Sequence, residues 1–489
     1  MPVYTKLFIA FFLCVFFTFY FILQLFRKNA RRGAFFSNGL IFLASVVFYA
    51  WDDVRFIPVL LVLGIVTYVS GLVLEGVGNG EKSRGTALYV LFMVLELGPI
   101  VVARFIGLFS SVGVIGARNL LVPLGLSFFT LQAFTYTDAV YRGRLKADRN
   151  ILNVLTFVSL FPCVSSGPIQ RAEKLLPQIQ KVERSFDYDE ATDGLKLIVW
   201  GLVKKLVIAD NLAIYIQNVR GAETSYGSAL LLSAIFYSFQ LYLDFSGYSD
   251  IVIGAAKALG FDLGLNFDHP YLSQSVGEFW RRWHISLSSW LRDYVYIPLG
   301  GSRVSPWKIY RNLLITFAVS GLWHGAGITW IIWGLYHGAW LCIERALGSS
   351  RKMRDSAGKL SIGKVILTFV IVTIGWIMFS SASVGEFWNI VSSFAKIPGE
   401  VAGVAWTEGF VSGLKALFMV TSDAHVGTSI LGLVAFGIIS SYTYGTKTCG
   451  LEIIRKQNAV VRWCGYFALI LLILLFGAAN SAEFIYNRF

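Results

Sequence analysis

Charged residues are scarce in this sequence. Of 489 residues, 15% are Asp, Glu, Lys or Arg, whereas 56% are hydrophobic and 16% aromatic; a soluble globular domain has roughly 25% charged residues. This composition excludes a soluble enzyme. Histidine is rarer still, with five residues, and the five cysteines form no CxxC pair. We therefore expect neither a disulfide framework nor a bound metal.

Signatures of nucleotide-driven and serine-based chemistry are also missing. The segment GKLSIGKV (358–365) has P-loop spacing, but Val365 stands where the magnesium-binding Ser or Thr should be. No G-x-S-x-G motif occurs. The sequence thus predicts neither ATP hydrolysis nor α/β-hydrolase chemistry.

Long apolar runs fill the chain instead. Runs of the length needed to cross a bilayer, about 20 residues, recur from end to end, for example 7–26, 56–74 and 463–479. We predict an all-α polytopic membrane protein with roughly 10–13 transmembrane helices plus re-entrant or interfacial helices. A single domain is expected over 1–489, with a motif-rich core at about 120–345 and late spans at 361–489.

The net charge of +13 would suggest a nucleic-acid partner in a soluble protein. Here the basic residues gather in short loops between apolar runs, at 27–32, 142–149 and 351–359. Such loops mark the cytoplasmic side of a membrane protein. The lipid bilayer is therefore the expected partner, and nucleic acid is not.

One polar segment, 274–303, carries a helical pattern. Its apolar residues recur at steps of three, four and seven: Val276, Phe279, Trp280, Trp283, Leu287, Trp290, Leu291 and Tyr294. Arginines and serines fall largely on the other faces, so the segment is too charged to cross lipid alone. We predict a helix that lies flat at the interface or re-enters the protein to line a polar cavity.

Two of the five histidines, His324 and His337, lie in the very apolar stretch 321–338. In a continuous helix they would be about 20 Å apart along the axis and roughly 220° apart around it, which excludes a shared metal. Glycines in the stretch allow a bend. An intramembrane histidine is by default a functional candidate, and imidazole can accept a proton from an attacking hydroxyl. We predict His324 as general base, whereas His337 is either catalytic or bonded to a neighbouring helix.

A second polar group lies in the apolar run 240–267. Asp244 and Asp250 occur there, together with Tyr248 and two serines. Buried carboxylates need partners, and the nearby arginine-rich segment could supply them. The alternatives are a buried ion-pair network and direct chemistry.

Taken in order, five stretches resemble the membrane-bound O-acyltransferase family, and within it the bacterial alginate O-acetyltransferase branch. They are VPLGLSFFTLQAFTYTDAVYRG (122–143), LFPCVSSGPIQR (160–171), YLDFSGYSDIVIG (242–254), EFWRRWHISLSSWLRDYVYIPLGGSR (278–303) and WHGAGITWIIWGLYHG (323–338). The ending FIY (484–486) also fits. A late-helix motif departs from the branch, with Ser380 in place of an arginine.

The resemblance implies a many-helix domain around a central tunnel, in which an acyl donor from the cytoplasm meets an acceptor from outside. His324 corresponds to the family's invariant histidine and His337 to a second tunnel histidine. The remaining matched residues would form the tunnel and its packed support: Asp244, Tyr248, Arg281, Arg282, His284, Trp290, Arg292, Asp293 and Trp323.

The expected function is transfer of an acyl group, acetyl above all, from a cytoplasmic thioester across the bacterial inner membrane. The donor would be acetyl-CoA or an acyl carrier protein, with no bound cofactor. The acceptor would belong to an exopolysaccharide, alginate-like or cellulose, or to a cell-wall glycan, reached through a periplasmic or extracellular acetyltransferase partner. The alternatives are a transporter or flippase, and a D-alanyl transferase for teichoic acid.

Overall fold

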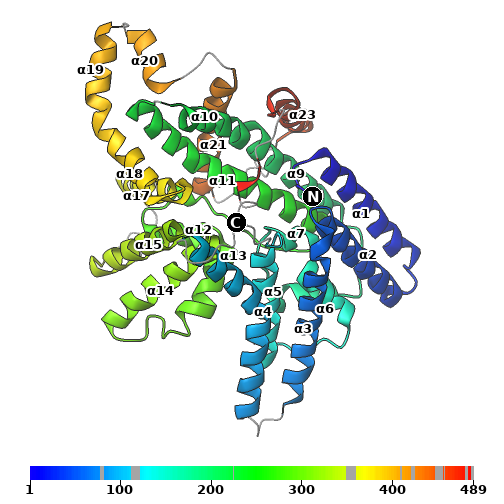
Figure 1. Cartoon of the computed structure of the whole chain (residues 1–489). Coiled ribbons are helices and arrows are strands. Elements are labelled where there is room, and N and C mark those ends of the chain that lie inside the picture. The colour runs from blue at the N-terminus through cyan, green and yellow to red at the C-terminus, as the bar shows by residue number, and fades with distance from the viewer. Residues whose placement is uncertain are drawn as a thin grey trace. The chain divides into compact units, whose positions relative to one another are not determined.

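The computed structural model describes residues 1–77, 82–111, 122–223, 225–348, 360–407, 410–419, 424–446, 455, 457–478 and 483–485. These residues form helices and no strand (Figure 1). Eight of the helices among them are long and apolar enough to cross a membrane. The predicted all-α polytopic membrane architecture is confirmed. The basic loop 351–359, the side chain of His425 and Tyr486 lie outside the described residues.

The chain divides into two compact units. One comprises Met1–Ile198 and Tyr248–Leu265, and the other comprises Val199–Gly247 and Asn266–Phe489. The single domain expected over the whole chain stays a prediction.

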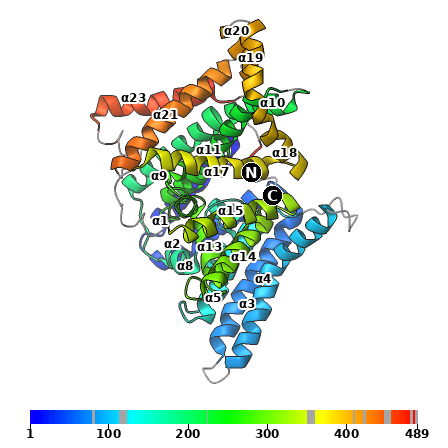
Figure 2. The same cartoon turned by 90° about the vertical axis from the view of Figure 1, so that its left-hand side faces the viewer.

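The first unit contains four of the candidate spans. Its helices are α1 (Lys6–Leu25), α2 (Ala30–Ala50), η1 (Val54–Phe56), α3 (Ile57–Gly76), α4 (Lys82–Ser111), α5 (Leu126–Tyr141), α6 (Ile151–Ser159), α7 (Phe161–Val164), α8 (Ala172–Gln180) and most of α9 (Tyr188–Leu202). Helices α3, α4 and α5 pack against one another, and α2 packs against α1 and α6. Figures 1 and 2 both show α3 beside α4.

The second unit holds both histidines of the apolar stretch. Its helices are η2 (Val203–Ala209), α10 (Asp210–Gly221), η3 (Pro270–Leu272), α12 (Val276–Arg282), α13 (Ile285–Leu291), η4 (Arg292–Tyr296), α14 (Pro306–His324), α15 (Ile328–Ala346), α17 (Ile362–Ser380), α18 (Val384–Ser393), η5 (Phe394–Lys396), α19 (Ile397–Thr407), α20 (Phe410–Phe418), α21 (Ala424–Thr446) and α23 (Ala459–Phe476). Helix α11 (Gly227–Ala258) belongs to this unit as far as Gly247.

Helices α14 and α15 form an antiparallel hairpin against α12 and α17. A Cβ atom on Gly334 would lie 2.1 Å from the carbonyl oxygen of Phe317, and one on Gly321 would lie 2.1 Å from that of Trp330. Only glycine therefore permits this distance between the two helix backbones. The hairpin is drawn in green in Figures 1 and 2.

The helix predicted within 274–303 is broken, so this part of the prediction is wrong. Its apolar face is buried from Val276 to Leu291, and Tyr294 is half-buried. However, α12 ends at Arg282, and His284 takes a left-handed conformation with φ of 43° before α13 starts. The side chain and the backbone of Asn266 both form hydrogen bonds at this corner. The backbone amide of Ile285 donates one of them to the backbone carbonyl oxygen of Asn266 at 2.9 Å. A distant segment, rather than local propensity, sets the break.

Candidate active site

His324 is the last residue of α14, and the chain turns at Gly325 and Gly327 before α15 begins. The glycines thus break the apolar stretch, as the sequence allowed. The His324 side chain is buried, with 2% exposure. Its imidazole lies among aromatic rings, 4.8 Å from that of Trp323 and 5.1 Å from that of Trp333, centroid to centroid.

His337 lies in the middle of α15 and is fully buried. The rings of Trp280, Trp333 and Trp376 lie 5.1, 5.2 and 6.2 Å from it. Within the described part of the chain, neither of its ring nitrogens has a hydrogen-bond partner, nor do the three indole N–H groups. Trp333 contacts both histidines, so folding the stretch into a hairpin brings them to one aromatic cluster. The catalytic assignment of both histidines stays a prediction.

His284 belongs to the same neighbourhood. It is 1% exposed, and its Nδ1 atom lies 3.2 Å from the side-chain oxygen of Asn266. Its ring contacts those of Phe245, at 4.8 Å, and Trp323, at 6.0 Å. The ring of Trp323 therefore lies between those of His284 and His324. Two of the predicted support residues, His284 and Trp323, are thus neighbours of the candidate base His324.

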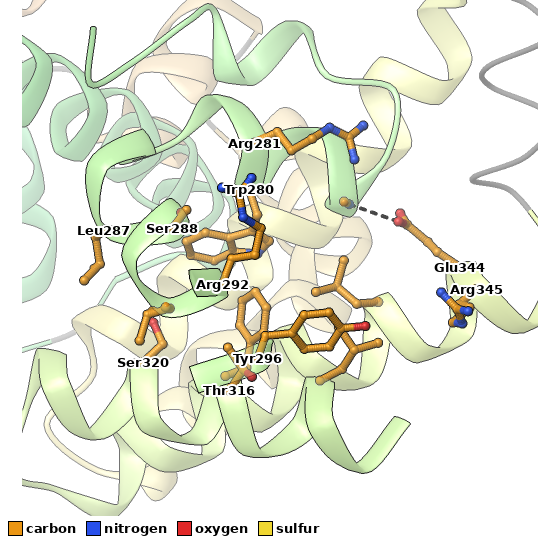
Figure 3. Close-up of a pocket in the computed structure, with 15 residues that line it drawn as sticks. Trp280, Arg281, Leu287, Ser288, Arg292, Tyr296, Thr316, Ser320, Glu344 and Arg345 are labelled. Atoms are coloured by element: carbon orange, nitrogen blue, oxygen red, sulfur yellow. Dashed lines mark hydrogen bonds between the residues drawn. The ribbon is translucent and has the colours of Figure 1, made fainter. Parts of the chain in front are cut away.

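A pocket of about 290 Å³ lies against this cluster (Figure 3). Trp280, which contacts His337, forms one wall, and Ser320, one helical turn before His324, forms another. Arg281, Arg292 and Arg345 contribute to the lining, and all three side chains are exposed. Figure 3 shows Ser320 and Leu287 on the side of the pocket opposite to Glu344 and Arg345. The pocket thus combines an apolar interior with cationic side chains.

Glu344 attaches two of the helices that line this pocket to each other. Its carboxylate accepts hydrogen bonds from the backbone amides of Val276, at 2.5 Å, and Gly277, at 3.0 Å. Because these amides begin α12, the first turn of that helix is attached to the last turn of α15.

Other predicted support residues have different partners. Arg282 pairs with Glu278 at 2.8 Å, and Arg292 pairs with Asp293 at 2.9 Å at the surface. Trp290 is 5% exposed and packs on Tyr294.

Asp244 has a partner that the sequence did not suggest. Lys205, which lies in η2, contacts both Asp244 and Asp210 at 2.8 Å, and all three side chains are at most 2% exposed. For Asp244 the ion-pair partner is thus Lys205 rather than an arginine of the segment 274–303, as the ion-pair alternative requires, and a direct chemical role for Asp244 stays a prediction. The other carboxylate oxygen of Asp244 accepts a hydrogen bond from the Ile485 amide at 3.0 Å.

Tyr248 belongs to the first unit. It is 5% exposed, and its hydroxyl lies 2.6 Å from that of Ser165. This contact joins two of the motif stretches, 242–254 and 160–171.

Several residues of the site escaped the sequence analysis, above all Trp330, Trp333, Trp376 and Phe379. Trp330, Trp333 and His337 follow one another at steps of three and four, so a helical stripe was visible. Trp376 and Phe379 come from α17, and no pattern in the sequence connects that helix to the hairpin.

Ser380 stands where the alginate O-acetyltransferase branch has an arginine. Its hydroxyl accepts a hydrogen bond from Arg220 at 2.8 Å, so a guanidinium group still lies at this position.

Eight described helices of membrane-spanning length, with two buried histidines near a pocket that has cationic side chains in its lining, indicate an integral membrane protein with a polar site in its interior. The model of the membrane-bound O-acyltransferase family matches residues 110–384, a range that includes both histidines and the whole pocket. The chain belongs to this family and is a membrane-bound O-acyltransferase.

Relatives with assigned names agree with this family. The chain is 38% identical over 368 residues to the probable alginate O-acetylase AlgI of Pseudomonas aeruginosa, which covers 73% of this chain and 69% of that protein. It is 33% identical over 434 residues to the peptidoglycan O-acetyltransferase of Helicobacter pylori, and this match covers 81% of this chain and 80% of that protein. The match to the teichoic acid D-alanyltransferase of Bacillus subtilis is shorter, with 30% identity over 217 residues, or 42% of this chain and 55% of that protein.

Proposed function

We propose that this protein transfers an acetyl group from a cytoplasmic thioester to a hydroxyl group on the outer side of the bacterial inner membrane, for O-acetylation of an extracytoplasmic glycan. The observation that carries the proposal is the position of His324, which is buried in an aromatic cluster one helical turn beyond the pocket residue Ser320. The names of the relatives, two of them O-acetyl transferases, support acetyl as the group and a glycan as the final acceptor.

The pocket suits the donor. Acetyl-CoA and acyl carrier proteins both present an acyl thioester on a phosphopantetheine arm. Arginine guanidinium groups bind phosphate oxygens in pairs of hydrogen bonds, and Arg281, Arg292 and Arg345 provide three such groups around an apolar interior. The thin arm would lie in the interior while the phosphates remain at the arginines.

The charge distribution favours a cytoplasmic opening for this pocket. Helix α15 runs from Ile328 to Ala346, and the strongly basic segment 351–359 follows it. Basic loops remain on the cytoplasmic side. Arg345 would then face the cytoplasm, and the turn at Gly325–Gly327 would face the opposite side.

The transfer needs no ATP hydrolysis and no metal in this scheme. His324 accepts the proton of the attacking hydroxyl as its oxygen forms a bond to the thioester carbonyl carbon. The carbon–sulfur bond then breaks, the ester leaves, and the thiolate takes the proton from His324. A hydroxyl has been acetylated, a thiol has been released, and the imidazole has returned to its initial state.

The acceptor of this step is either the glycan itself or a hydroxyl on an extracytoplasmic acetyltransferase partner that passes the group on. An enzyme confined to the membrane can reach a secreted polymer only during export, so a partner extends its range.

The test is the base-labile ester content of envelope and secreted polysaccharide, measured by mass spectrometry in cells with wild type or His324→Gln. Loss of one acetyl ester is expected from His324→Gln, and the lost ester identifies the acceptor. His269→Asn serves as control, because His269 lies outside the cluster beside Asp268 and Thr443, and it should retain the ester. His337→Asn, measured alongside, tests the second histidine and should also lose it.

Other outcomes would contradict the proposal. Unchanged ester with stable His324→Gln protein in the membrane would exclude a catalytic His324 and favour a transporter. Loss of D-alanyl instead of acetyl esters would favour the teichoic acid alternative.

A further inference from the structure

Within the described part of the chain, four aromatic rings lie close to the imidazole of His324. Their centroids lie 4.8 Å (Trp323), 5.1 Å (Trp333), 5.4 Å (Phe379) and 6.3 Å (Trp330) from that of His324. Three of these rings are buried with the histidine, whereas Trp330 is partly exposed. Trp330 is therefore the ring of this group that meets the surface.

The indole of Trp330 lies directly on the backbone that follows His324. A Cβ atom on Gly325 would come within 2.2 Å of its Nε1 atom. Gly325 has an extended backbone with φ of −166°, so its lack of a side chain serves this close approach rather than an unusual conformation. Phe379 supports the indole from the side, at 4.4 Å and nearly perpendicular.

Trp330 does not line the pocket. The pocket is lined by Thr316, Phe317 and Ser320, which precede His324 on α14. Arg345 lies fifteen residues beyond Trp330 in α15, or about 22 Å along the helix axis. A donor bound in the pocket would therefore leave the partly exposed face of Trp330 open to an acceptor.

We infer that Trp330 is the acceptor-side residue of this enzyme, which covers His324 until an acceptor displaces its ring and which thereby selects a hydroxyl acceptor over water. The inference rests on the function proposed above. An indole presents a flat apolar face with one hydrogen-bond donor, which suits the C–H face of a sugar ring beside its hydroxyl groups.

The side reaction that Trp330 would suppress is hydrolysis of the thioester donor. With water in place of the acceptor, its oxygen attacks the thioester carbonyl carbon, the carbon–sulfur bond breaks, and acetate and thiol are released. His324 handles the proton as in the transfer. A site that excludes water suppresses this reaction, and loss of the cover should permit it.

The first experiment measures thiol release from acetyl-CoA and from acetyl-pantetheine, without acceptor, by full-length protein in lipid nanodiscs. Trp330→Ala should raise hydrolysis of at least one thioester about tenfold over wild type, a change of about 1.4 kcal/mol in barrier. The double variant Trp330→Ala/His324→Gln should lose the increase. Hydrolysis that does not rise, or a rise that survives loss of His324, would overturn the inference.

A second variant keeps the indole and moves it. Gly325→Ala places a methyl group against the Trp330 ring, so the ring must shift and hydrolysis should rise as in Trp330→Ala. Gly327→Ala is the graded comparison in the same turn: its Cβ would lie 3.3 Å from the nearest indole atom, so the ring need move by only a few tenths of an ångström and hydrolysis should rise clearly less than in Gly325→Ala. Equal hydrolysis in the two glycine variants would contradict the role of the contact with Gly325.

The two proposals fail separately. If His324→Gln abolishes the cellular ester while Trp330→Ala raises no hydrolysis, the proposed acetyl transfer is supported and the role inferred for Trp330 is wrong. If the ester persists in His324→Gln, the proposed function is wrong, and so is the role inferred for Trp330.

Discussion

Lys205 gives the most direct test of how the second unit is held together. Its ammonium group bridges Asp210 and Asp244 in a position that is 1% exposed. Replacing it by methionine keeps the side-chain length but leaves two carboxylates buried close to one another. Breaking a buried ion pair by removing one partner costs about 3–5 kcal/mol, and here a single substitution removes the partner of two groups.

The opposite substitution should cost less. Asp244→Asn leaves Lys205 paired one to one with Asp210, and the amide oxygen can still accept the hydrogen bond from Ile485. The triple change Lys205→Met/Asp210→Asn/Asp244→Asn removes all three charges. It should recover most of the stability lost in Lys205→Met, because that loss comes from burying uncompensated charges and the triple variant leaves none.

The assay is thermal unfolding of purified protein in detergent, followed by intrinsic tryptophan fluorescence, together with the yield of monodisperse protein. We expect the order wild type, Asp244→Asn, triple variant, Lys205→Met in decreasing melting temperature. A Lys205→Met protein as stable as Asp244→Asn would refute the assignment of Lys205 as the common partner of both carboxylates.

Two further variants probe the pocket and the hairpin. Arg292→Gln/Arg345→Gln should raise KM for acetyl-CoA about tenfold or more with little change in kcat, because the lost contacts bind the donor before and during the reaction alike; a fall in kcat alone would contradict this. Gly334→Ala places a methyl group against the carbonyl oxygen of Phe317 and should abolish activity and lower the melting temperature, since overpacking costs about 1–3 kcal/mol or more. Gly363→Ala, with open space around it, is the matched control and should behave as wild type.

Much of the fold followed from the sequence because bilayer insertion depends on local features. The length of apolar runs and the scarcity of charge predict helices across lipid without reference to tertiary contacts. Similarly, the spacing from Val276 to Leu291 groups the apolar residues on one helical face, and these are the residues that are buried. The break at His284 could not be predicted, because the residue that stabilises it, Asn266, lies eighteen positions earlier and outside the helical pattern.

The site was predictable only in part, for a related reason. His324 was conspicuous because an imidazole in an apolar run needs an explanation and because glycines follow it. The partner of Asp244 was not, since Lys205 lies 39 residues away on another helix and looks like an ordinary lysine near the end of a span. Trp376 and Phe379 likewise reach the histidines through the packing of α17, which sequence alone does not specify.

The attachment of Glu344 to the start of α12 makes the pocket observable in solution. The amides of Val276 and Gly277 bond a side chain of another helix rather than a backbone carbonyl of their own. Their hydrogen exchange therefore reports how often α12 and α15 separate, independently of unfolding within either helix. Two neighbouring amide protons thus act as a gauge of the opening of the pocket, and a donor that holds the two helices together would slow their exchange.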